Sequence, residues 1–201
     1  MTDRPLLPIV GQQPHERSDA ARNREALLAA AAALVDRCGA DAVTMDAVAD
    51  AAGVGKGTVF RRFTTRAGLM AALLDRSETT WQAAVMSGPP PLGPGAPPRE
   101  RLLAFGRSRL EASLQHAALI RAASTAPVRS YAAYSFTATH VRYLLGELDV
   151  AGDIALLATA LLAPLEMVIL DQQIEIENME VSRIVAGWED LAERIIARRR
   201  S

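Results

Sequence analysis

Residues 44–63 read TMDAVADAAGVGKGTVFRRF, and this stretch decides the fold of the N-terminal part of the chain. In its first half, Val48, Ala49 and Ala52 are small apolar residues at the spacing of one helical face. In its second half, Val59 and Phe63 lie four positions apart, which also places them on one face of a helix. Between the halves, Gly53 permits the positive φ that a sharp turn requires. The stretch therefore predicts two short helices that pack closely across a tight turn.

The second of these helices carries a local cluster of positive charge. Lys56 is the only lysine of the chain, Arg61, Arg62 and Arg66 follow it, and residues 51–74 contain no acidic residue. The whole chain has a formal net charge of −1, so the surface is not basic in general. Such a cluster is typical of an element that enters a nucleic-acid groove, and the alternative is a solvated basic face on an ordinary helix.

The side chains opposite the inner apolar pair form one outer surface. Thr58, Arg61 and Arg62 lie at positions i, i+3 and i+4 of a helix and so share a face. Arginine or lysine can reach guanine O6 and N7, and the threonine methyl group can contact thymine. Gly57 has no side chain and would let the backbone approach DNA closely. We therefore interpret residues 44–63 as a helix-turn-helix whose second helix reads the major groove.

The composition indicates an all-α protein, because alanine, leucine, arginine and glutamate dominate and β-branched runs are scarce. We expect residues 1–17 to be a disordered arm and residues 18–65 to be a three-helix DNA-binding domain. Its first helix carries an apolar stripe that includes Cys38, which we expect to be an inert core residue. Residues 66–201 would form a C-terminal helical bundle with a Pro/Gly-rich loop at 88–98, and the family resemblance described below implies that this bundle is for ligand binding and dimerisation.

The C-terminal part is expected to contain helices at about 99–115, 117–125, 128–147, 152–177 and 180–199. The last two carry apolar seams, which include Ile154 and Val168 on one helix and Ile184 and Trp188 on the other. These two helices can bury their seams against each other, or share them with a second copy of the chain as a four-helix interface.

The segment from about Arg24 to Leu74 resembles the DNA-binding domain of the TetR family of transcriptional regulators. The matching residues are Leu27, Leu28, Ala31, Leu34, Gly39, Thr44, Val48, Ala49, Ala52, Gly53, Val54, Lys56, Gly57, Thr58, Val59, Phe60, Phe63, Arg66 and Leu69. The rest of the chain is similar to the family only in length and helical character.

The resemblance implies a role for each matching position. Thr44 would hold a phosphate at a helix N-terminus, and Arg66 would grip another phosphate. Phe60 stands where the family commonly has a tyrosine that contacts a phosphate, a bond that phenylalanine cannot make. Arg62 would reach either a base or the backbone. The complete set of DNA-binding candidates is Thr44, Gly55, Lys56, Gly57, Thr58, Phe60, Arg61, Arg62 and Arg66.

Aromatic and polar side chains concentrate in one C-terminal segment, where all three tyrosines lie close to His140. Amphipathic aromatics on one helix can line a ligand cavity, and the alternative is that they are core or rim residues of a bundle. Two residues of the preceding helix at 99–115 are further candidates. The ligand-binding candidates are Phe105, Arg109, Tyr131, Tyr134, His140 and Tyr143.

No motif in the chain indicates catalysis. The three histidines are isolated, and nucleophile motifs, phosphate-binding loops and paired-histidine metal spacings are absent from the sequence. We therefore expect no enzymatic activity, no metal and no cofactor. No signal peptide or membrane span is recognisable, which favours a cytoplasmic protein.

These observations predict a sequence-specific transcriptional regulator. The resemblance implies a homodimer, joined through the last two helices, that binds a pseudo-palindromic DNA operator and acts as a repressor. A small-molecule effector of unknown identity would change the separation of its two reading heads. The alternatives are a ligand-independent regulator or activator with the same DNA head, and a small-molecule-binding protein whose DNA head is vestigial.

Overall fold

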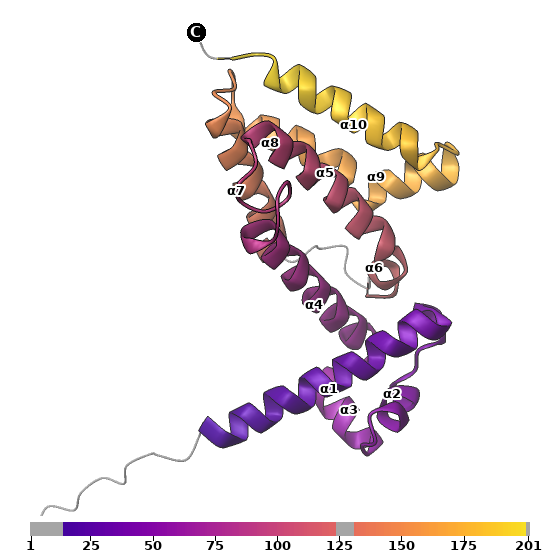
Figure 1. Ribbon diagram of the computed structural model, residues 1–201. Coiled ribbons are helices and arrows are strands. Elements are labelled where there is room, and N and C mark those ends of the chain that lie inside the picture. Colours follow the sequence, from indigo (N-terminus) through magenta and orange to yellow (C-terminus); the bar gives the residue numbers. More distant parts are fainter. Residues whose placement is uncertain (1–13, 124–130, 200–201) are drawn as a thin grey trace, which may run out of the picture. The chain divides into compact units, whose positions relative to one another are not determined.

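The computed structural model describes residues 14–123 and 131–199 (Figure 1). In this part of the chain every regular element is a helix, apart from one isolated bridge between Val150 and Arg199, so the expected all-α class is confirmed. The chain divides into two compact units, residues 1–69 and residues 70–201.

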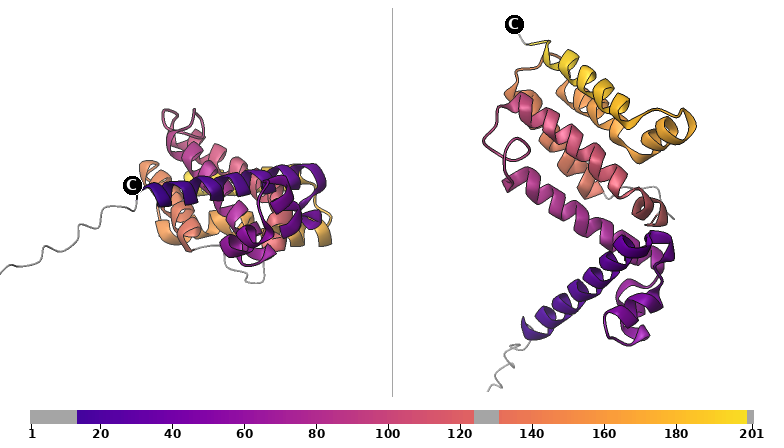
Figure 2. Two further views of the ribbon diagram at one scale, coloured as in Figure 1. Left: turned by 90° about the horizontal axis from the view of Figure 1, so that it is seen from below. Right: turned by 45° about the vertical axis from the view of Figure 1, so that its right-hand side comes forward.

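The first unit places a pair of short helices beside a long one. It contains α1 (Pro14–Cys38), the 3-10 turn η1 (Ala40–Ala42), α2 (Met45–Ala51), α3 (Lys56–Phe63) and the beginning of α4 (Arg66–Ser87). Helices α2 and α3 pack together on one side of α1 (Figures 1 and 2). The core of the unit includes Leu27, Leu28, Val48, Val59 and Phe63.

Two expectations for α1 need correction. The helix begins at Pro14, so residues 14–17 are helical and do not belong to a disordered arm, while residues 1–13 lie outside the described residues. Proline is compatible with the first turn of a helix because the N–H that it lacks has no partner there. Cys38 is exposed rather than buried, because α1 ends at this residue, and its Sγ donates to the carbonyl of Leu34 at 2.9 Å.

The second unit continues α4 and adds the rest of the helices. These are α5 (Pro98–Gln115), α6 (Ala117–Ala123), α7 (Tyr131–Glu147), α8 (Ile154–Leu162), η2 (Ala163–Leu165), α9 (Met167–Asp171), the π-helical turn η3 (Gln172–Ile176) and α10 (Val181–Ile196). Helix α5 packs on α7 and α10, and α8 packs on the same two helices, so these four helices enclose a shared core. The Pro/Gly-rich loop between α4 and α5 ends at Pro97, and Leu92 within it packs against this core.

The helix expected at 152–177 is not continuous. It begins as expected after Asp153, whose carboxylate accepts from the N–H groups of Ala155 and Leu156. Pro164 then falls in the 3-10 turn η2, and Glu166 adopts an extended backbone with φ −77° and ψ 138° before α9 restarts. The break turns Val168 out of the predicted inner seam, and this side chain is 74% exposed.

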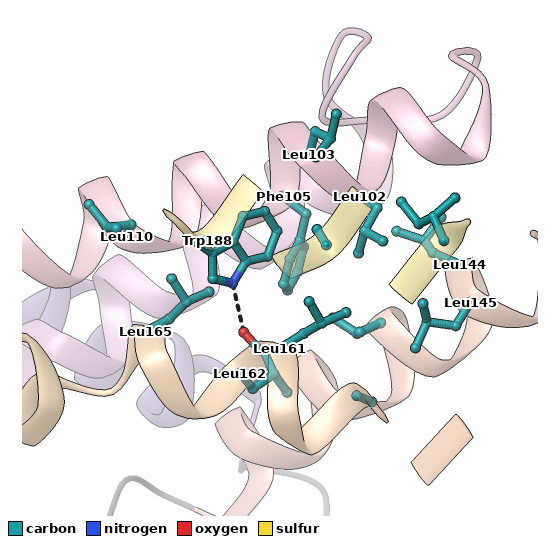
Figure 3. Close-up of a cluster of buried hydrophobic side chains, with 14 of the residues drawn as sticks. Leu102, Leu103, Phe105, Leu110, Leu144, Leu145, Leu161, Leu162, Leu165 and Trp188 are labelled. Carbon is teal, nitrogen blue, oxygen red and sulfur yellow. Dashed lines mark hydrogen bonds between the residues drawn. The ribbon is translucent and has the colours of Figure 1, made fainter. Parts of the chain in front are cut away.

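The seam of α10 is buried within the unit, where Ile184 and Trp188 face α5 and α8. Figure 3 shows the indole of Trp188 among leucines of these helices, donating from Nε1 to the carbonyl of Leu161 at 2.8 Å. Gly106 makes this approach possible, because a Cβ at this position would lie 1.9 Å from the indole. Of the two alternatives for the α10 seam, the structure shows burial within one chain.

No single helix of the described residues is long and apolar enough to cross a membrane. The two parts Ile154–Leu165 and Met167–Ile176 satisfy the length and composition criterion only when taken together, and they are bent by 46°.

Candidate nucleic-acid interface and buried aromatic cluster

The turn between α2 and α3 has the geometry that its glycine predicted. Gly53 has a φ of 65°, and the N–H of Val54 donates back to the carbonyl of Ala49 at 3.0 Å, which closes the C-terminus of α2. At the other end of α2, Thr44 is the N-cap, and its Oγ1 accepts from the N–H of Ala47 at 3.1 Å. These bonds fix the position from which α3 begins.

Helix α3 has one buried face and one solvent-exposed face, called its bare face below. Val59 is fully buried, and Phe63 is 6% exposed with the guanidinium of Arg24 over its ring at 5.9 Å from the centroid. A Cβ at Gly57 would meet no atom within 4 Å, so nothing in the first unit fills the space above this residue. The exposed residues of this helix and its N-cap are Gly55, Lys56, Gly57, Phe60, Arg61 and Arg62, and Thr58 is half-buried between them.

The ammonium group of Lys56 is paired with Asp46 across the turn. Its Nζ donates to Asp46 Oδ2 at 2.6 Å, and both side chains are more than half exposed. The hydrogen bond and the attraction of Asp46, with a smaller contribution from Asp50, raise the pKa of Lys56. The lysine is therefore positively charged and is oriented over the N-terminal end of α3.

The two arginines of α3 point to different places. Arg61 lies along the outer face, where its Nε donates to the carbonyl of Gly57 at 3.2 Å and its Nη2 to Thr58 Oγ1 at 3.4 Å. Arg62 instead donates to the carbonyl of Ala20 in α1. The guanidinium of Arg62 therefore joins α3 to α1, and its contact with a base or with the DNA backbone stays a prediction.

Arg66 also has a different environment from the one that the resemblance implied. Its Nε donates to the carbonyl of Val43 at 2.9 Å and its Nη2 to the carbonyl of Ala40 at 2.6 Å, with Asp41 3.8 Å away. The guanidinium therefore joins the first turn of α4 to the segment that leads into α2. In this structure it has a bracing role between these two segments, and the phosphate contact stays a prediction.

The second unit contains a buried aromatic cluster, formed by Trp81 of α4, Phe105 of α5, and Phe136 and His140 of α7. The ring centroids of Trp81 and Phe105 are 5.2 Å apart, and those of Phe105 and His140 are 5.3 Å apart in a stacked arrangement. The guanidinium of Arg109 lies 4.9 Å from the centroid of the Trp81 ring. The cluster is therefore a continuous contact between three helices.

Charged groups accompany these rings. Arg109 donates to Glu78 at 2.7 Å in a pair whose side chains are 8% and 19% exposed, and Trp81 Nε1 donates to Ser108 Oγ at 3.3 Å. Burial, and secondly the positive charge of Arg101, lower the pKa of His140 to about 4. The imidazole is therefore neutral at pH 7.

The ligand-binding candidates do not all lie in this cluster. Phe105 and His140 belong to it, Arg109 lies over its Trp81 ring, and Tyr134 is half-buried against the same core. Tyr143 is 53% exposed, and the side chain of Tyr131 lies outside the described residues. Sequence reasoning missed Glu78, Trp81, Arg101 and Ser108.

The described residues contain no group of three or more His, Cys, Asp or Glu side chains that could hold a metal ion.

The bare face of α3, positioned by the glycine turn, defines the first unit as a helix-turn-helix DNA-binding domain. The family model of bacterial regulatory proteins of the tetR family matches residues 27–73. The chain therefore has the DNA-binding domain and the fold of a TetR-family transcriptional regulator, as the resemblance predicted.

Solved structures with the same fold cover nearly the whole chain. A TetR-like transcriptional regulator from Rhodococcus sp. RHA1 is 24% identical with a TM-score of 0.56, covering 88% of this chain and 97% of that chain. The multidrug binding protein EbrR, complexed with imidazole, is 22% identical with a TM-score of 0.58 over 94% and 97%. The fatty acid degradation regulator FadR from Bacillus halodurans is 14% identical with a TM-score of 0.59 over 85% and 94%. No curated protein matches the chain.

The bracing role of Arg66 makes a prediction about stability. Arg66→Ala should lower the free energy of unfolding by about 1–3 kcal/mol, because two carbonyls lose a charged donor. Urea unfolding without DNA measures this, and Arg61→Ala on the exposed face is the matched control, expected to stay within about 0.5 kcal/mol of the wild type. Unchanged stability of Arg66→Ala, with a lower salt dependence of DNA binding, would instead place the guanidinium on a phosphate.

Proposed function

We propose that this protein is a sequence-specific transcriptional regulator that binds a pseudo-palindromic operator as a homodimer. The observation that carries the proposal is the outer face of α3, where Lys56 and Arg61 flank a glycine with open space above it. Repression would follow from occlusion of a promoter. A protein with this function works on chromosomal DNA in the cytoplasm.

The outer face of α3 supplies groups of the kinds that read base edges. Lys56 and Arg61 offer cationic donors for guanine, and Thr58 offers a methyl group and a hydroxyl between them. Gly57 allows the helix backbone to lie close to the bases. Thr44 Oγ1 accepts from the backbone of α2, and its hydroxyl hydrogen remains suited to a phosphate oxygen at the edge of the groove.

Selection of bound genomic fragments tests this proposal directly. We expect one enriched inverted repeat, and fluorescence anisotropy at two salt concentrations should show tighter binding to this repeat than to a scrambled duplex. Because Lys56 and Arg61 face the bases, Lys56→Ala and Arg61→Ala should reduce that preference. Binding without sequence preference at either salt concentration would contradict the proposal.

A second copy of the chain would cover the apolar residues that the second unit leaves exposed. Leu156 of α8, Val168 of α9 and Ile176 of η3 are each at least 68% exposed. Ile169 and the first residue of α10, Val181, extend the set. Exposed apolar residues on the consecutive elements from α8 to the start of α10 support a protein interface, and they support the expected homodimer through the last helices.

Val168→Asp should therefore weaken dimerisation by about 100-fold or more, because an isologous interface would place the new carboxylate in both copies of an apolar contact. Analytical ultracentrifugation across a concentration series measures the dissociation constant. Met86→Asp is the matched control, since Met86 is a 58% exposed apolar residue of α4. If the two substitutions changed the dimer dissociation constant equally, the surface around Val168 would not be part of the dimer interface.

We further propose that a small molecule binds at the aromatic cluster and changes the affinity for DNA. The cluster combines apolar rings with a few buried polar groups, which is the usual composition of a ligand site. EbrR, which has the same fold, is described as a multidrug binding protein. A ligand acts in this way only if it binds the DNA-competent and DNA-free states with different affinity.

A further inference from the structure

Three buried nitrogen atoms at the aromatic cluster have no hydrogen-bond partner among the described residues. They are Arg101 Nε, Arg109 Nε and His140 Nε2. Arg109 and His140 are each only 7% exposed. A buried donor without a partner costs about 1–3 kcal/mol, so three of them in one region are unusual for a core that serves only stability.

His140 stacks on Phe105, Arg109 lies over the Trp81 ring, and Arg101 is near enough to His140 for its charge to lower the pKa of the imidazole. Arg101, Phe105 and Arg109 follow one another at four-residue spacing and so form a stripe along α5, about 12 Å from first to last at 1.5 Å per residue. His140 stacks on Phe105 in the middle of this stripe, and its ring is nearly parallel to that of Phe136, with 7° between the planes. A molecule that satisfies these nitrogens would therefore also contact aromatic rings.

The charges of the cluster do not cancel. Arg109 is neutralised by Glu78, whereas no carboxylate pairs with Arg101 among the described residues. His140 is neutral at pH 7. The guanidinium N–H groups can only donate, so the cluster offers one uncompensated positive charge and donors without acceptors.

We propose that the aromatic cluster binds a small organic monoanion that carries one carboxylate on a flat apolar body. The carboxylate accepts from Arg101 Nε and lies beside His140, the body lies against the partly buried ring of Phe136, and a second acceptor can meet Arg109 Nε. This assignment rests on the proposed function for the role of the ligand as an effector, but the binding itself does not depend on DNA.

The experiment compares three probes of one shape and different charge, which are 2-naphthoate, 2-naphthol and 2-naphthylmethylammonium. Isothermal titration calorimetry on the full chain without DNA measures their binding. We expect 2-naphthoate to bind at least tenfold more tightly than either of the other two. Arg101→Gln should weaken 2-naphthoate binding at least tenfold and leave 2-naphthol binding unchanged, because the substitution removes the unpaired charge and keeps the apolar rings.

Arg99→Gln is the matched control, because Arg99 is two residues away on α5, exposed, and paired with Glu193. It should leave 2-naphthoate binding unchanged. Equal binding of all three probes, no binding of 2-naphthoate at millimolar concentration, or equal losses in the two arginine variants would overturn the inference. Thermal unfolding of both variants without ligand verifies that each is folded.

A separate anisotropy assay distinguishes the inference from the proposed function. If 2-naphthoate binds as expected but leaves the affinity for the selected operator unchanged, the inference about the ligand class is supported and the proposed role of the ligand as an effector is contradicted. If the protein binds the operator but calorimetry detects no binding of 2-naphthoate, the proposed DNA-binding function is supported and the inferred ligand class is contradicted.

Discussion

Gly106→Ala is expected to lower the free energy of unfolding by about 2–4 kcal/mol, although it adds a single methyl group. The new Cβ would lie 1.9 Å from one carbon of the Trp188 ring and 2.1 Å from the next. The indole cannot move aside without losing its buried bond from Nε1 to the carbonyl of Leu161. Helices α5 and α10 must therefore separate, which opens the core that Figure 3 shows.

Chemical unfolding monitored by circular dichroism measures this effect. The matched control is Gly146→Ala in α7, where a Cβ would meet no atom within 4 Å. Alanine is the better helix former, so the control should be neutral or stabilising by up to about 1 kcal/mol. The smaller, ringless side chain in the double variant Gly106→Ala with Trp188→Leu should recover part of the loss. Equal stability of Gly106→Ala and Gly146→Ala would show that the α5–α10 contact is looser than described.

Gly57→Glu is expected to abolish DNA binding while leaving the protein folded. The position is helical and open, so the side chain meets nothing in the first unit, and glutamate favours helix over glycine. In the proposed complex the same side chain would stand between the α3 backbone and DNA, with a carboxylate facing phosphates. Because juxtaposed like charges cost several kcal/mol, the affinity should fall by about 100-fold or more.

Anisotropy with the selected operator, together with thermal unfolding, separates these two effects. Gly57→Gln has nearly the same shape without the charge and should retain more affinity than Gly57→Glu, while Gly57→Ala should retain the most. If Gly57→Glu binds DNA as the wild type does, this face of α3 is not the reading surface.

The helix-turn-helix was predictable because its determinants are local. The apolar spacing of Val48, Val59 and Phe63 specifies which faces are buried, and Gly53 is needed for a backbone angle that other residues rarely adopt. The family match to residues 27–73 agrees with this prediction. The exposed position of Lys56 followed from the same periodicity.

The partners of the arginines were not predictable in this way. Arg62 and Arg66 belong to the same run of positive charge as Arg61, yet their guanidinium groups donate to carbonyls of Ala20, Ala40 and Val43. Those acceptors lie 42, 26 and 23 positions away in the chain. Long flexible side chains choose partners in space, and the sequence carries no periodic signal for such a choice.

For the aromatic cluster too, the sequence predicted one part of the site and the tertiary structure decided the other. The sequence indicated a concentration of aromatic residues around His140, but Trp81 and Arg101 joined the site only when α4, α5 and α7 packed together. The packing leaves Tyr143 53% exposed at the edge of the cluster, with its ring centroid 6.4 Å from that of His140.

The sequence by itself determined the all-α class, the reading helix and its bare outer face, because each depends on residues within one or two helical turns. Only the tertiary structure decided that Lys56 pairs with Asp46, that Arg66 braces the start of α2, and that Val168 faces outward after the break at Pro164. The physical reason is the distance along the chain over which each kind of interaction acts. Helical periodicity and turn geometry act between neighbours, whereas charge pairing and burial depend on which distant segments meet when the core closes.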